Sequence, residues 1–234
     1  MSRRAKVIIV VALVIAASPI WGFELLYRVY LPANRPQLPE ATDATPLELD
    51  ALWLEAGERP TSSDVTPLWA LNYFRMYKPG ADPRPGVHAV ARVARLWAAQ
   101  AWPPDARVDH LRRAVAEMAV IVWLSRTASA DALKRALAAD TYFGRHAYGI
   151  GRARRAYFGC SAAPLSTAQI ALLVGIPQNP SRCDPVAHPD VAAKRRQYMV
   201  QALAASGVIS ADDAAKAASE KAEAAVAAKS APCQ

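Results

Sequence analysis

The sequence is poor in cysteine, with three in 234 residues. Cys160, Cys183 and Cys233 include no CxxC pair and no spacing typical of metal ligands, which argues against a zinc site. The four histidines form no metal-binding pattern either. An oxidising compartment would permit a Cys160–Cys183 disulfide that leaves Cys233 free. Three unpaired thiols are the alternative, and the sequence leaves both open.

Glycine is scarce as well, with ten glycines against eighteen prolines and alanine-rich segments between them. This composition favours helices joined by proline-marked loops over a sheet of short strands. With 53% hydrophobic residues, the chain can bury one sizeable core, but it is too short for two full catalytic domains. We therefore expect a mainly α protein with one folded domain.

Acidic residues are too few to balance the basic ones, and the formal net charge is +8. Such a charge favours anionic partners. No zinc-finger, recognition-helix or aromatic RNA-binding signature is present, so we expect no nucleic-acid partner. Because an apolar segment lies at the N-terminus, a phosphate group at a membrane is the better candidate.

No charged residue occurs from Val7 to Phe23, a length close to the ~20 residues that cross a bilayer. Three basic residues precede this segment and should stay in the cytoplasm. We expect an uncleaved membrane helix, with a cleaved signal peptide as the alternative. The rest of the chain would then lie in the periplasm of a bacterium, anchored to the inner membrane by a single pass.

Composition divides the chain into four segments. We expect a basic cytoplasmic end and transmembrane anchor at 1–27, and a proline-rich tether with a short helix at 28–67. A helical domain follows at 68–216, and an Ala/Lys-rich tail at 217–234.

Capping residues mark several helices in these segments. Pro46 can open a short helix that Gly57 closes. Helical spacing over 109–126, with an apolar run from Ala119 to Trp123, predicts a central buried helix. Further helix starts are predicted near Ser129, Ser166, Pro189 and Ser210.

The most distinctive stretch interleaves glycines with aromatic and basic residues over 142–159. Glycine lets a backbone approach a ligand closely, and guanidinium groups offer forked donors to phosphate oxygens. The pattern therefore suits a phosphate-bearing ligand near a membrane. A solvated basic helix face between glycine turns would give the same pattern.

This stretch, with Tyr142-Phe143-Gly144-Arg145, Tyr148-Gly149-Ile150 and Tyr157-Phe158-Gly159, resembles the late signature of the peptidoglycan glycosyltransferases. These are the transglycosylase domains of penicillin-binding proteins and the monofunctional transglycosylases. The similarity continues in the family's order through 165–185, 189–196 and 207–210, and it covers roughly 108–216.

The resemblance implies a lysozyme-like helical fold that polymerises glycan strands from a lipid-linked disaccharide-peptide in cell-wall synthesis. It also implies that the precursor, the glycan strand, the membrane and other cell-wall proteins are partners. It allows a divalent cation, Mg²⁺ or Mn²⁺, as a cofactor. By resemblance Glu117 matches the second active-site glutamate, while Arg113 and Arg145 would bind the diphosphate. Without the resemblance, Arg113 and Glu117 form an ordinary same-face pair on a helix.

The departures from the family lie mainly upstream. Aligned on Pro79-Gly80-Ala81-Asp82, the general-base glutamate becomes Leu71, which cannot accept a proton. A family lysine becomes Ala114. The polar Gly-Ser-Thr-Ile-Thr-Gln-Gln motif is at best 86–92, where His88 is the candidate substitute base. Two further polar positions of the family become Ala139 and Gly151. Asp64 and Asp82 could supply a carboxylate in place of the missing base, but nothing in the sequence places either of them in the site.

Three functions follow from these residues. The first is an active transglycosylase with catalytic Glu117. The second is an inactive family member that binds lipid diphosphate or acts as a scaffold in the cell-wall machinery. The third, a lysozyme-like hydrolase, needs two placed carboxylates and ranks last.

Overall fold

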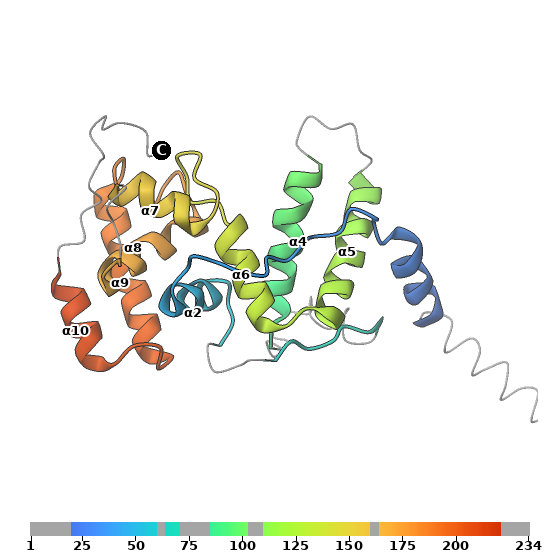
Figure 1. Cartoon of the computed structure of the whole chain (residues 1–234), viewed down its shortest axis with the longest axis horizontal. Coiled ribbons are helices and arrows are strands. Elements are labelled where there is room, and N and C mark those ends of the chain that lie inside the picture. Colours follow the sequence, from blue (N-terminus) through green and yellow to red (C-terminus); the bar gives the residue numbers. More distant parts are fainter. Residues whose placement is uncertain (1–19, 60–63, 71–84, 103–109, 160–163, 221–234) are drawn as a thin grey trace, which may run out of the picture. The chain divides into compact units, whose positions relative to one another are not determined.

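The computed structural model describes residues 20–59, 64–70, 85–102, 110–159 and 164–220. In these ranges the chain is mainly helical, and the β-structure is confined to an isolated bridge between Tyr142 and Tyr148. The expectation of a mainly α protein is therefore confirmed. Residues 20–30 are helical, and the labelled elements follow them in Figure 1.

The labelled helices run along the chain in the following order. They are α2 (Pro46–Glu55), α4 (Val87–Ala101), α5 (His110–Thr127), α6 (Ala130–Asp140), α7 (Ile150–Phe158), α8 (Thr167–Gly175), the 3₁₀ helix η1 (Ile176–Gln178), α9 (Pro189–Ala205) and α10 (Ala211–Ser219).

The helix starts predicted from capping residues are confirmed. Ser129, Ser166 and Ser210 each accept a hydrogen bond from a backbone N–H in the first turn of α6, α8 and α10. Pro46 and Pro189 open α2 and α9. Residue 109, where the helical spacing of the central helix was expected to begin, lies outside the described residues.

Helix α4 was not identified from the sequence, and its N-terminus explains why. The N-cap is Gly86, with a φ of 77° and no side-chain capping bond. Its backbone approaches Val65, whose Cα would lie 2.9 Å from a Cβ at this position. The start therefore depends on a contact from another segment, which no local capping signal reveals.

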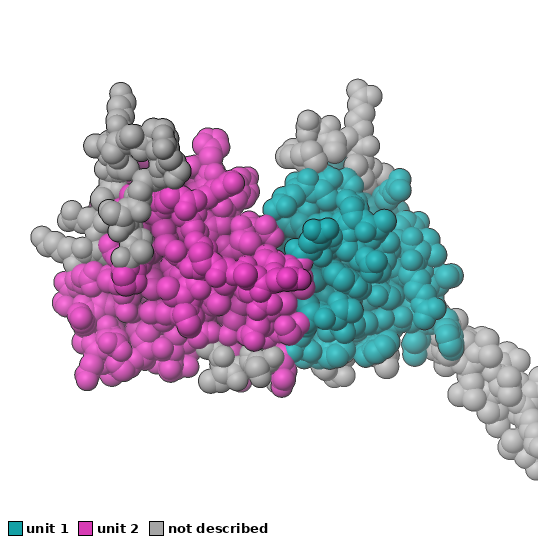
Figure 2. Space-filling model, viewed as in Figure 1, with its two compact units in different colours: residues 1–37, 65–128 teal, residues 38–64, 129–234 magenta. Residues whose placement is uncertain are grey.

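The chain forms two compact units, shown in different colours in Figure 2. Unit 1 comprises 1–37 and 65–128, and unit 2 comprises 38–64 and 129–234. Each unit therefore combines an N-terminal segment with a later part of the chain. We describe each by itself.

In unit 1, α4 packs against α5. Ala119, Val120, Val122 and Leu124 of α5 are completely buried, which confirms the expected central helix. The Ser125 hydroxyl accepts a hydrogen bond from the Leu68 amide at 2.9 Å and donates to a carbonyl of its own helix. This bond fastens the segment before residue 71 to α5.

In unit 2, α2 packs on α6 and α8, α8 packs on α9, and α10 lies on both α8 and α9. A single apolar core joins these helices. Its largest fully buried members include Phe143, Tyr157, Leu173 and Met199. The segments around this core come from both sides of residues 65–128 in the sequence.

A buried ion pair ties the start of unit 2 to α7. Arg154 Nε and Nη2 donate to the two carboxylate oxygens of Glu48 at 2.8 and 2.9 Å. Glu48 is 1% exposed and also closes the capping box of α2 with Thr45. Arg154 Nη2 donates in addition to the carbonyl of Asp43 at 2.8 Å. One guanidinium thus holds the segment before α2, and α2 itself, on α7.

No helix in the described ranges is both long and apolar enough to cross a membrane. Most of the expected anchor, residues 1–19, falls outside those ranges, as does most of the expected tail, residues 221–234.

Replacing Arg154 with Met should destabilise the protein by about 3–5 kcal/mol, because it leaves the Glu48 carboxylate buried without a counter-charge. Urea unfolding measures the change. The neighbouring Arg155, which is exposed on the same helix, provides the control. Arg155→Met should alter the free energy of unfolding by only about 0.5 kcal/mol. Equal losses in both variants would contradict this role for the pair.

Candidate functional site

Glu117 lies on α5 and faces α4. Its side chain is 25% exposed, and Arg95 Nε of α4 lies 3.9 Å from its Oε1. The Arg95 side chain is largely exposed, so solvent weakens this pair. The structure therefore places the expected glutamate at a partly open helix–helix seam, with an arginine beside it.

Arg113 lies one helical turn before Glu117 and on the same face of α5. Arg92 lies three residues before Arg95 on α4, also on the same face. Arg92 and Arg113 are partly buried, whereas Arg95 is exposed. The seam thus gathers positive charge around a single carboxylate. Such a group can bind phosphate oxygens, because guanidinium groups offer paired, charge-assisted donors.

His88 lies on the exposed surface in the first turn of α4. It shares a face with Arg95 but precedes it by seven residues, which is about 10 Å along the helix. The structure thus places Glu117 beside Arg95, with Arg113 one turn before Glu117 on α5 and His88 two turns before Arg95 on α4. Leu71 and Asp82 lie outside the described residues, and Asp64 is exposed in unit 2.

Arg145 belongs to unit 2, in a turn between Thr141 and Gly149. Arg145 and His146 are left-handed, with φ of 48° and 59°. Such backbone is costly for residues other than glycine, so surrounding contacts must hold it. Arg145 Nε donates to Asp184 Oδ2 at 2.9 Å. Its proposed contact with a diphosphate stays a prediction, and Asp184 would compete for the same guanidinium.

The backbone conformation of the turn itself requires glycine at position 149. Gly149 has a φ of 82°, and a Cβ there would lie 2.5 Å from the Ala139 carbonyl oxygen. The Gly149 amide donates to the Thr141 carbonyl at 2.9 Å and closes the turn. The structure therefore accounts for Gly149 without a ligand. Helix α7 follows between Gly149 and Gly159; its Arg152 and Arg155 are exposed, whereas Arg154 is paired with Glu48.

Tyr157 of α7 stabilises the turn between Thr141 and Gly149 through a hydrogen bond. Its ring is buried, and its hydroxyl donates to the Phe143 carbonyl at 2.7 Å. Burial, reinforced by the negative charge of Asp184, raises the pKa of Tyr157 from 10.0 to about 12. The phenol is therefore a structural donor that stays protonated at neutral pH.

Sequence reasoning missed Arg95 and Asp184, the partners of two residues that it had named. Arg95 could have been found from helical spacing, since it lies on the face of α4 that carries His88. Asp184 is far from Arg145 in the sequence, and no local pattern joins them. Cys183, next to it, is a buried free thiol, while Cys160, its expected partner in the disulfide, lies outside the described residues.

A divalent cation finds no adequate set of protein ligands in the described ranges. They contain no group of three His, Cys, Asp or Glu side chains that could hold one. Magnesium in phosphate sites uses one or two carboxylates together with the phosphates. Glu117 offers one carboxylate, and a guanidinium already lies beside it. We therefore derive no step through a metal.

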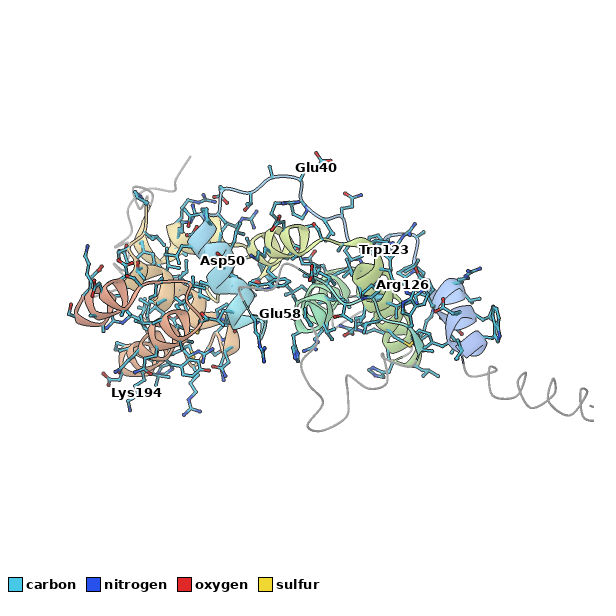
Figure 3. The ribbon with its side chains drawn as sticks, turned by 90° about the horizontal axis from the view of Figure 1, so that it is seen from below. Glu40, Asp50, Glu58, Trp123, Arg126 and Lys194 are labelled. Carbon is cyan, nitrogen blue, oxygen red and sulfur yellow. The ribbon has the colours of Figure 1, made fainter. Side chains whose placement is uncertain are left out.

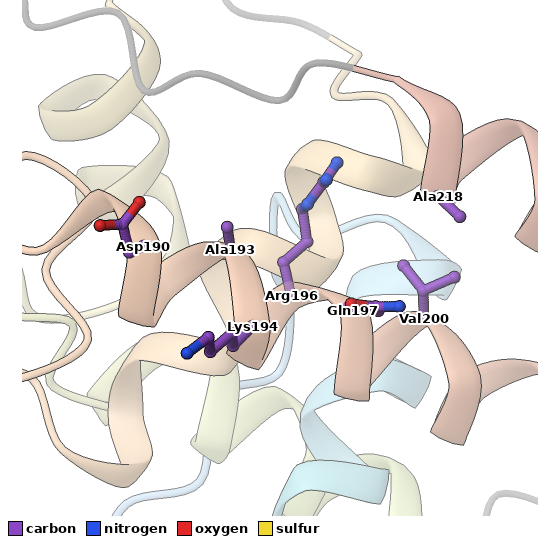
Figure 4. Close-up of a pocket in the computed structure, with 7 residues that line it drawn as sticks. All are labelled: Asp190, Ala193, Lys194, Arg196, Gln197, Val200 and Ala218. Carbon is purple, nitrogen blue, oxygen red and sulfur yellow. The ribbon is translucent and has the colours of Figure 1, made fainter.

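A surface groove of about 460 Å³ lies along α9 and α10 in unit 2 (Figure 4). Arg196 Nη1 donates to the carbonyls of Ala217 and Glu220 at 3.2 and 2.6 Å. Its guanidinium group therefore caps the C-terminal end of α10. We assign this groove no catalytic role. It is lined by Asp190, Ala193, Lys194, Arg196, Gln197, Val200 and Ala218.

Comparison with known families decides the identity of the central region. Residues 94–204 match the family model described as transglycosylase. This region belongs to the peptidoglycan glycosyltransferases. The transglycosylase match begins within α4 and ends in α9, so it includes Arg113, Glu117 and Arg145. His88 and Leu71 precede it.

Curated relatives agree with this assignment. The chain is 28% identical over 173 residues to penicillin-binding protein 1A of Mycolicibacterium smegmatis, which covers 73% of this chain and 22% of the relative. It is 37% identical over 101 residues to penicillin-binding protein 1A/1B of Bacillus subtilis, covering 43% of this chain and 11% of the relative. It is 32% identical over 107 residues to penicillin-binding protein 1A of Streptococcus oralis, covering 46% of this chain and 17% of the relative. The chain thus spans less than a quarter of each of these relatives.

The raised pKa of Tyr157 predicts a stability loss at high pH. Because the folded pKa exceeds the ordinary value of 10.0, its contribution is complete below pH 10 and is lost as pH rises towards 12. Urea unfolding between pH 8 and about 12 should show an extra loss on the order of 2 kcal/mol in the parent relative to Tyr157→Phe. Tyr198→Phe, at an exposed site, is the control and should follow the parent. Parallel curves for the parent and Tyr157→Phe would refute the assignment.

Proposed function

We propose that this protein is a membrane-anchored transglycosylase of peptidoglycan synthesis that extends glycan strands from a lipid-linked disaccharide-peptide. The observation that supports it most is the Arg95–Glu117 pair, with Arg113 one turn away, inside the region that matches the transglycosylase family. The proposed anchor is 1–27, the proposed tether 28–67, and the proposed catalytic domain 68–216, in the periplasm.

Binding of the lipid diphosphate would use the basic seam between α4 and α5. Arg95 lies across from Glu117 on α4, Arg113 lies one turn before Glu117 on α5, and both would donate to phosphate oxygens. When no substrate is bound, Glu117 would hold the arginines in place through its negative charge. When the diphosphate binds, Glu117 would remain beside it as part of the site. Positive charge placed where the leaving group develops negative charge lowers the barrier of the transfer step.

The reaction transfers a glycosyl group with inversion. The 4-hydroxyl oxygen of one sugar attacks the anomeric carbon of the other, and the bond from that carbon to the phosphate oxygen breaks. The polyprenyl diphosphate leaves with the bonding electrons, and the hydroxyl proton passes to a base or to water. Leu71 stands where the family has that base, so we expect slow turnover. A positioned base typically contributes about 10²–10⁴-fold.

A second candidate function is binding without polymerisation, in a scaffold of the cell-wall machinery. Its support is chemical, because Glu117 is the one carboxylate among the described residues that we place at the α4–α5 seam. His88, the candidate substitute base, lies about 10 Å along α4 from Arg95. Such a protein would keep the basic seam and bind the precursor, but it would release it unchanged.

Full-length protein in vesicles that contain the lipid-linked precursor should form glycan polymer, and Glu117→Gln should reduce the rate by about 10²-fold or more. Gel separation of labelled glycan measures both. Glu40→Gln, at an exposed position of unit 2, removes the same charge and should leave the rate unchanged. Precursor binding without any polymer in the parent protein would favour the second candidate instead.

A further inference from the structure

The helix of residues 20–30 has two different faces. Phe23 is 3% exposed, and Glu24 and Tyr27 also lie toward the rest of unit 1. Trp21, Leu25 and Val29 point the other way and are 63–72% exposed. These last three residues are four apart, so they form one stripe along the helix, which we call the outer stripe.

Arg126 holds the inner face of this helix. Its Nη1 and Nη2 donate to the two carboxylate oxygens of Glu24 at 3.1 and 2.6 Å. Its guanidinium carbon lies 4.8 Å from the ring centre of Tyr27 and 3.9 Å from that of Trp69. Its Nε donates to the Leu68 carbonyl at 3.0 Å. Figure 3 labels Arg126 on α5.

Both partners of this pair are shielded from water. The side chains of Arg126 and Glu24 are 13% and 20% exposed, and their contact is bidentate. Paired, charge-assisted bonds in such a setting are stronger and more directional than those of an exposed pair. The helix is therefore fixed on α5, the same helix that carries Glu117.

The outer stripe, by contrast, is a large apolar face without a protein neighbour in the described ranges. Tryptophan is enriched at the boundary between lipid and water, and leucine and valine suit the lipid side. The uncharged segment of the sequence, from Val7 to Phe23, runs directly into this helix. A lipid bilayer is the partner that both features fit, because an apolar segment inserted there brings the stripe to its surface.

We propose that the outer stripe of residues 20–30 lies in the outer interface of the bilayer and that Arg126 clamps this helix to α5. The proposal rests on the proposed membrane anchoring and adds to it. The anchor then holds the α4–α5 seam in a set orientation at the membrane surface, where the lipid-linked precursor presents its diphosphate. Arg126 is a positioning residue, since it acts through α5 and touches no substrate in this account.

Spin labels test the lipid contact in full-length protein reconstituted in vesicles. In a background with the three cysteines replaced by alanine, single cysteines at Leu25 and Val29 carry the label. Collisions with oxygen should be frequent there, and collisions with a water-soluble nickel chelate rare. A label at Tyr198, exposed on unit 2, is the control and should meet the nickel chelate freely. A label at Leu13 reports whether the chain is anchored at all.

The outcomes separate the inference from the proposed function. A label at Leu13 in lipid with labels at Leu25 and Val29 in water overturns the inference and leaves the anchor standing. A label at Leu13 in water overturns the anchor itself. Labels at Leu25 and Val29 that neither reagent reaches, with dipolar broadening between molecules, would assign the stripe to a second copy and also overturn the inference.

Trypsin tests the clamp. In reconstituted protein, Arg126→Gln should speed cleavage after Arg28 at least tenfold, which corresponds to about 1.4 kcal/mol in local opening. Arg112→Gln removes the same charge from an exposed position of the same helix and should leave this cleavage unchanged. In the polymerisation assay Arg126→Gln should raise KM for membrane-embedded precursor more than it lowers kcat. Unchanged cleavage in Arg126→Gln would overturn the clamp.

Discussion

The pairing of a shielded arginine with a carboxylate from the N-terminal part of the chain is the constraint on which both units depend. In unit 1, Arg126 holds Glu24, and in unit 2, Arg154 holds Glu48. Each pair joins segments that are about a hundred residues apart in the sequence. Breaking such a pair leaves a charge with little solvent and no partner, which costs more than an apolar contact of similar size.

The residues of the candidate site fit one half of the proposed reaction better than the other. Arg95 and Arg113 supply positive charge beside Glu117, and that arrangement suits a diphosphate leaving group. The acceptance of a proton from the attacking hydroxyl has no such support, since Leu71 cannot perform it and His88 lies two helical turns from Arg95. Within the proposed function, binding and leaving-group stabilisation are thus better supported than proton transfer.

Local signals predicted much of the helical fold from the sequence. Serine and proline residues predict the starts of α6, α8, α9 and α10, because helix capping involves only residues that are neighbours in the chain. The start of α4 and the Arg145–Asp184 pair depend on tertiary contacts and could not be found in that way. For the site, motif order proposed Arg113 and Glu117, whereas the contact between Glu117 and Arg95 joins two helices and is seen only in the structure.

In the proposed mechanism, the absence of a carboxylate at position 71 slows turnover, and placing one there is the most direct test. The rate of glycan polymerisation should be measured for the parent and for Leu71→Glu, at matched binding of the lipid-linked precursor. We predict that Leu71→Glu is faster by about 10²–10⁴-fold, the usual contribution of a positioned general base. An unchanged rate, with binding intact and the fold preserved, would contradict the account.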